Sequence, residues 1–117
     1  MTKMVGFYTE LDPHDALYTG SILDAFRNVP ADNEEQVVAY LEAGVALIDI
    51  MEACHDVITG DRYIVGCSSV FTDGLWIWRK DLPYYVRRYH LELDAEFLNQ
   101  AAGNGYLVPR NSTCQCT

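Results

Sequence analysis

Apolar residues recur at helical spacing in the first half of the chain. The segment after Asp32 has its apolar residues on one side, an acid at Glu35 where it stabilises the first turn, and a stop signal at Gly44. The apolar residues are Val37, Val38 and Leu41. This pattern predicts a helix. A shorter helix is predicted over residues 22–27, with Ser21 as its cap.

The second half contains two more helical patterns. Asp81 is a suitable cap for a stretch whose apolar residues recur at i, i+3, i+4 and i+7. These residues are Leu82, Tyr85, Val86 and Tyr89. Asp94 then caps "AEFLNQAAG", which ends at Gly103. Both stretches predict helices that pack one side against a core.

Three runs between these helices have the pattern of strands. Residues 45–52 favour a strand because branched residues follow a glycine, although a helix over 45–55 is an alternative. Residues 63–71 and 75–78 predict two further strands, and residues 54–61 a connection. Between the last two strands, Asp73-Gly74 predicts a tight hairpin with a type I′ turn. The chain is therefore expected to be α+β, with a three-stranded antiparallel β-meander packed between helices.

The hairpin places two tryptophans on one face. With Asp73-Gly74 as the loop, Phe71 is opposite Trp76, and Trp78 lies on the same side. We interpret both indoles as core residues packed against the helix after Asp81. A contact surface that includes one indole is the alternative.

Length and composition indicate a single domain. The chain has 117 residues, of which 50% are hydrophobic, enough to bury a core. We expect one domain over residues 1–110 and a disordered polar tail over 111–117. The apolar runs are too short to span a bilayer, and the start lacks the pattern of a secretory signal. These features predict a cytoplasmic protein without membrane contact.

Charge divides the chain into two unequal parts. The net charge is −9, and residues 1–61 hold twelve acids against Lys3 and Arg27, whereas residues 62–117 hold five acids against six bases. An acidic field opposes phosphate backbones, so nucleic-acid binding is disfavoured, and it accelerates encounter with a basic protein. Solubility alone would also account for it.

One long stretch carries a resemblance. The run "TDGLWIWRKDLPYYVRRYHLELDAEFL" resembles a set of small uncharacterised bacterial proteins, common in actinobacteria, that share a TDG-x-W-x-W turn, a D-L-x-Y-Y-V-x-x-Y-H helix and an F-L helix. "VVAYLEAGV" and "DVITGDRYIVG" are similar to their upstream segments, so the resemblance covers residues 33–100. It implies a shared fold but no established activity. Association with toxins implies, at most, an immunity or accessory role.

Candidate catalytic chemistry is sparse. Cys54, His55 and Asp56 combine a nucleophile, a base and a carboxylate, but consecutive residues of an extended chain point to alternate sides and cannot form a relay. Cys54 and Cys67 are expected to be buried reduced thiols. Cys114 and Cys116 are expected in a frayed end, with metal binding as the alternative. No cofactor is expected.

The one basic and aromatic segment follows the hairpin. It contains Arg79, Lys80, Arg87 and Arg88 among Trp78, Tyr84 and Tyr85. Single-stranded nucleic acid binds to such residues, but we favour ion pairs with the acidic half of the chain, or a protein interface.

These observations predict a non-enzymatic protein-binding module that covers the basic surface of a partner. The acidic residues expected to bind that partner are Asp32, Glu34, Glu35, Glu42, Asp49, Glu52 and Asp56. The alternatives are a small hydrolase or transferase that uses Cys54 or His55, and a homo-oligomer, such as a dimer, joined through the ribbon.

Overall fold

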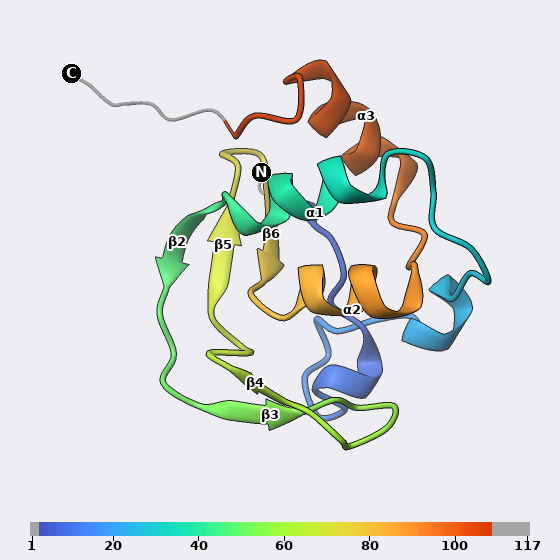
Figure 1. The fold of residues 1–117 in the computed structure, drawn as a ribbon. Coiled ribbons are helices and arrows are strands. Elements are labelled where there is room, and N and C mark those ends of the chain that lie inside the picture. The colour runs from blue at the N-terminus through green and yellow to red at the C-terminus, as the bar shows by residue number, and fades with distance from the viewer. Residues whose placement is uncertain (1–2, 109–117) are drawn as a thin grey trace.

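The computed structural model describes residues 3–108, and Figure 1 shows their arrangement. The α-helices are α1 (Glu34–Glu42), α2 (Leu82–Tyr89) and α3 (Ala95–Gly103), with 3₁₀ turns at Thr9–Leu11 and Ile22–Ala25. The strands are β1 (Lys3–Met4), β2 (Val45–Ile48), β3 (Ala53–His55), β4 (Tyr63–Val65), β5 (Val70–Thr72) and β6 (Trp76–Arg79). The α+β class is confirmed. The tail at 111–117 lies outside the described residues.

The strands form two sheets rather than a three-stranded meander. The larger sheet has the order β1-β6-β5-β2, in which β1 runs parallel to β6 and the other pairs are antiparallel. The smaller sheet pairs β3 with β4. The run at 63–71, expected to be one strand, is broken at Gly66, whose φ of +71° suits glycine. Residues 53–55, of which Cys54 and His55 were expected within the connection, pair with the first piece of that run.

The hairpin forms where the sequence predicts it, but its loop is one residue later. Thr72 is opposite Ile77 and Phe71 is opposite Trp78, so the turn is centred between Gly74 and Leu75, and residues 73–75 connect the two strands. Only Gly74, at φ +101°, has a positive φ, and the predicted type I′ turn is therefore wrong. Asp73 instead accepts hydrogen bonds from the backbone N–H groups of Leu75 and Trp76, at 3.0 and 2.7 Å. The pairing shifts by two residues, which leaves each side chain on its predicted face.

Both tryptophans are core residues, as predicted. Trp76 and Trp78 are 3% and 0% exposed. The Trp78 indole N–H donates to the carbonyl oxygen of Leu41 at 3.0 Å, which fastens α1 to β6. The Phe97 ring of α3 lies 5.6 Å from the Trp76 ring and 5.5 Å from the Trp78 ring. The helices α1 and α2 lie side by side across β6 (Figure 1).

Three of the four predicted helix starts agree with the structure, and two of the four predicted caps form a side-chain hydrogen bond. Asp94 caps α3 and Ser21 caps the turn at Ile22–Ala25, each through a side-chain hydrogen bond. Asp32 is not the cap of α1, which starts after Asn33. Asp81 precedes α2 without a side-chain cap bond; its Oδ2 accepts from the buried guanidinium of Arg79 at 2.9 Å, and its Oδ1 has no hydrogen-bond partner among the described residues. A buried cation needs a counter-charge more than a helix needs a cap.

Candidate functional site

Two of the seven predicted partner-binding acids are inside the protein. Glu34 is 8% exposed, and its Oε1 lies 2.8 Å from Nδ1 of His90. Asp56 is 2% exposed. Because both carboxylates are covered by this chain, neither offers a surface for a partner. Placing them in the binding face corrects the sequence interpretation.

Asp56 is the centre of a hydrogen-bond network that joins the β3–β4 hairpin to α2. Its carboxylate accepts from the hydroxyls of Tyr84 (2.6 Å) and Tyr89 (2.7 Å), from the Arg88 guanidinium (3.1 Å), and from the backbone N–H groups of Ile58 (2.7 Å) and Thr59 (3.2 Å). Burial alone would raise the pKa of Asp56, but the hydrogen bonds outweigh it and lower the pKa below its ordinary value. A carboxylate bound in this way positions its neighbours and is a poor base.

Acid should therefore destabilise the protein through Asp56. The unfolded chain binds the proton more tightly than the folded chain does, so the stability contributed by Asp56 is present above about pH 4 and is lost as pH falls further. Asp56→Asn should lower the free energy of unfolding by about 2 kcal/mol at neutral pH. Its loss of stability between about pH 5 and pH 3 should be smaller than that of the wild type. Urea unfolding across this range measures the free energy of unfolding of the wild type and of Asp56→Asn. Equal loss of stability in acid for the two proteins would contradict the role given to Asp56.

The other five predicted acids are exposed, but they lie in different parts of the fold and have different contacts. Glu35 and Glu42 face Arg87 on α2, at 3.3 and 3.8 Å. Asp49 and Glu52 follow β2 and accept hydrogen bonds from Ser69 and Ser68. Asp32 lies before α1. Among the described residues, Asp32, Asp49 and Glu52 form no ion pair.

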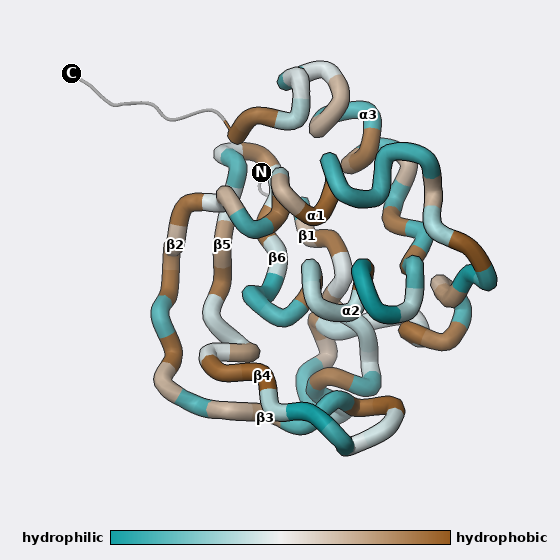
Figure 2. Tube along the Cα trace, viewed as in Figure 1, coloured by the Kyte–Doolittle hydropathy of each residue, from teal (hydrophilic) through white to brown (hydrophobic). Residues whose placement is uncertain are grey.

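The strand β2 is exposed along its whole length. It is an edge strand of the larger sheet, paired only with β5, and all four of its residues are exposed. Leu47 and Ile48 are 57% and 54% exposed, and Met51, just beyond the strand, is 99% exposed. Figure 2 shows the hydrophobic colouring of β2 at the side of the molecule. An apolar edge of this kind makes β2 a candidate site for association.

The sequence indicates an apolar strand here but does not indicate that the strand lies at an open edge. The run from Val45 to Ile48 is apolar on both faces, which is typical of a strand covered on both sides. The described helices pack over β6 and leave β2 uncovered, a consequence of strand order that no local pattern encodes.

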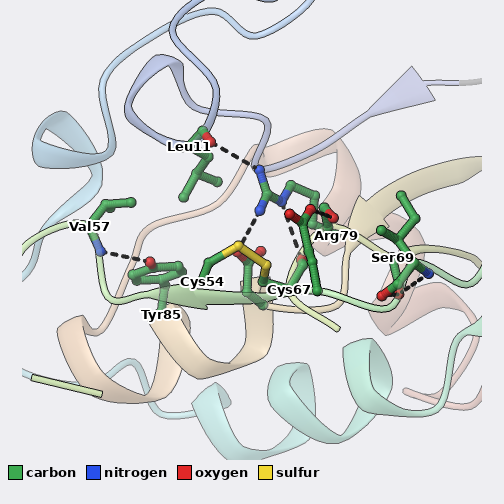
Figure 3. Close-up of a disulfide and its surroundings, with 11 residues drawn as sticks. Leu11, Cys54, Val57, Cys67, Ser69, Arg79 and Tyr85 are labelled. Carbon is green, nitrogen blue, oxygen red and sulfur yellow. Dashed lines mark hydrogen bonds and ion pairs between the residues drawn. A yellow bond between two sulfur atoms is a disulfide. The ribbon is translucent and has the colours of Figure 1, made fainter. Parts of the chain in front are cut away.

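The cysteines expected to be free thiols are joined to each other. Cys54 on β3 and Cys67 after β4 form a disulfide with a Cα–Cα distance of 5.9 Å (Figure 3). The expectation of reduced thiols is wrong, because the β3–β4 pairing that brings them together was not predicted. A disulfide offers no thiolate, so catalysis through Cys54 has no nucleophile in this state. Glu52 lies near both sulfurs, but disulfide sulfurs are not thiolate metal ligands.

The remaining catalytic and metal candidates gain no support. His55 is exposed and its ring lies 4.3 Å from that of Tyr63. Cys114 and Cys116 lie outside the described residues. Among residues 3–108, no helix is long and apolar enough to cross a membrane.

The basic segment forms ion pairs within the protein, as predicted. Arg87 binds Glu35 and Glu42, and Arg88 binds Asp56 and Asp61 at 3.1 and 2.8 Å. All four acids belong to the first half of the chain. Arg79 is 3% exposed and donates to the carbonyl oxygens of Cys67 and Leu11 (Figure 3). Three of the four cations of this segment therefore stabilise the fold.

Comparison with known proteins adds no function. The stretch that carries the resemblance to small bacterial proteins forms the hairpin loop, β6, α2 and the start of α3. The resemblance itself stays a prediction. No protein-family model, curated protein or solved structure matches this chain.

Proposed function

We propose that the protein is a non-enzymatic binding module that takes an extended segment of another protein along β2. The observation that carries this proposal is the exposure of every residue of an apolar edge strand. Partner strands bind such edges through main-chain hydrogen bonds and side-chain contacts. The pairing of β2 with β5 is irregular between Ala46 and Ile48, which shortens the regular edge, so apolar contacts carry much of the affinity.

The surroundings of β2 favour a basic partner. Asp49 and Glu52, which form no ion pair among the described residues, follow the strand, and Glu42 precedes it. A partner strand with apolar residues and flanking lysines or arginines matches this arrangement. A second copy of the chain carries the same charge of −9 and the same flanking acids, which disfavours a dimer through this edge.

A cytoplasmic location stays a prediction, and the disulfide weighs against it. Disulfides persist in oxidising compartments and are rare where glutathione keeps thiols reduced. An immunity role remains compatible with the proposed binding mode, since such proteins act by covering a partner.

A synthetic strand peptide tests the proposal. We expect a Val/Ile-rich peptide flanked by lysines to bind the protein, and its glutamate-flanked counterpart to bind at least tenfold more weakly, because the carboxylates near β2 repel it. Leu47→Lys should weaken binding at least tenfold by placing a charge on the apolar edge. Leu17→Lys is the matched control, since Leu17 is equally apolar, 67% exposed and far from β2 in the sequence.

Isothermal titration calorimetry measures these affinities. Equal binding of both peptides, or a Leu47→Lys variant that binds normally, would contradict the proposal. Light scattering tests whether a second copy of this chain occupies the edge instead. A dimer that Leu47→Lys dissociates would assign the edge to that second copy.

A further inference from the structure

A groove lined by α1, α2, β5 and the residues just before β4 and just after β6 gathers half of the cationic side chains of the protein. It has a volume of about 640 Å³. The cations that line it are Arg62, Lys80, Arg87 and Arg88, four of the eight in the sequence. Glu42 is the one acid among its described lining residues. Four carboxylates, those of Glu35, Glu42, Asp56 and Asp61, pair with two of these cations, Arg87 and Arg88.

The other two cations form no ion pair within the described chain. Arg87 and Arg88 are bound to carboxylates. Arg62 and Lys80 form no ion pair with any residue between 3 and 108. Charges in a concave surface focus the field and raise the local concentration of anions.

The lining between the cations is apolar and fixed in place. It consists of Leu41, Phe71, Pro83 and the ring of Tyr84. The Tyr84 hydroxyl is bound to Asp56 at 2.6 Å, which holds the ring. The Lys80 side chain lies against Gly66, because a β-carbon at Gly66 would be 3.2 Å from its Nζ. The Tyr84 ring of the floor is therefore positioned before any ligand enters.

We propose that this groove binds a small organic anion. Its carboxylate, sulfonate or phosphate group is held by Arg62 and Lys80, and its flat apolar body lies on Leu41, Phe71 and Pro83. Apolar walls with a few convergent polar groups are typical of small-molecule sites. The inference is independent of the function proposed for β2, since the residues that line the groove include none of that strand.

Calorimetry on the full chain tests the groove with two isosteric probes, naphthalene-1-sulfonate and the neutral naphthalene-1-sulfonamide. We expect the sulfonate to bind at least tenfold more tightly. Replacing both cations, Arg62→Gln with Lys80→Gln, should remove this preference. Arg62→Lys with Lys80→Arg keeps both charges and should retain it. Arg27→Gln should also retain it, because Arg27 is an exposed cation that does not line the groove.

Four results would overturn the proposal. They are absence of saturable sulfonate binding, equal affinity for the two probes, an unchanged preference in the double glutamine variant, and binding of inorganic phosphate as tight as that of the sulfonate. The last would show that the apolar floor contributes nothing. Circular dichroism should find the double variant folded, because both side chains are on the surface and unpaired among the described residues.

Discussion

Trp78→Ala should lower the free energy of unfolding by about 4 kcal/mol, the largest effect expected of any single substitution discussed. Trp78 is fully buried, so its removal leaves a cavity between β6 and α1. The indole also donates to the Leu41 carbonyl at 3.0 Å, and alanine leaves that buried acceptor without its donor. The Phe97 ring loses an aromatic contact as well.

Trp78→Phe separates these contributions, because it retains most of the apolar volume but not the N–H donor. We expect it to cost about 2 kcal/mol. Leu75→Ala, in the loop of the same hairpin and 38% exposed, is the control and should change stability by less than about 0.5 kcal/mol. Urea unfolding followed by circular dichroism measures all three. If Trp78→Ala lowered the free energy of unfolding by less than Leu75→Ala does, the assignment of Trp78 to the core would be contradicted.

Removing the disulfide should lower the free energy of unfolding by about 3 kcal/mol. Cys54 and Cys67 are 13 residues apart, so the bond closes a loop of about 15 residues in the unfolded chain and reduces its entropy. The bond also ties β3 to the turn that leads into β5. We expect Cys54→Ser with Cys67→Ser to show the full loss.

Reduction provides the matched experiment. A reductant should destabilise the wild type to the level of the double serine variant and should leave that variant unchanged. Peptide mapping after iodoacetamide treatment of the native protein should find Cys54 and Cys67 unmodified until reductant is added. Rapid alkylation of Cys54 without reductant would contradict the disulfide and would revive a nucleophilic role for this cysteine.

The elements most accurately predicted are those that a short stretch of sequence encodes. The stripe of Leu82, Tyr85 and Val86 is buried in the structure, and the Asp94 cap forms as expected. The paired tryptophans share the predicted buried face even though the loop shifts by one residue. In each case the periodicity of side chains within a helix or strand determines which side meets the core.

The candidate sites were predicted less well, because they depend on strand order and on distant contacts. The acidic character of the first half did not reveal that Asp56 binds Tyr84 and Arg88, which are 28 and 32 residues away. Composition likewise gave no indication that Arg62 and Lys80 line the same groove. Sequence reasoning located the charged residues but could not determine which ones face inward.

The sequence by itself determined the α+β class, the three α-helices, the position of the hairpin and the burial of both indoles, because these follow from local spacing and capping. Only the tertiary structure decided that the 63–71 run divides at Gly66, that Cys54 meets Cys67, and that β2 is left at an open edge. These three features arise from pairing between segments far apart along the chain. Local propensity carries no information about which segments will meet.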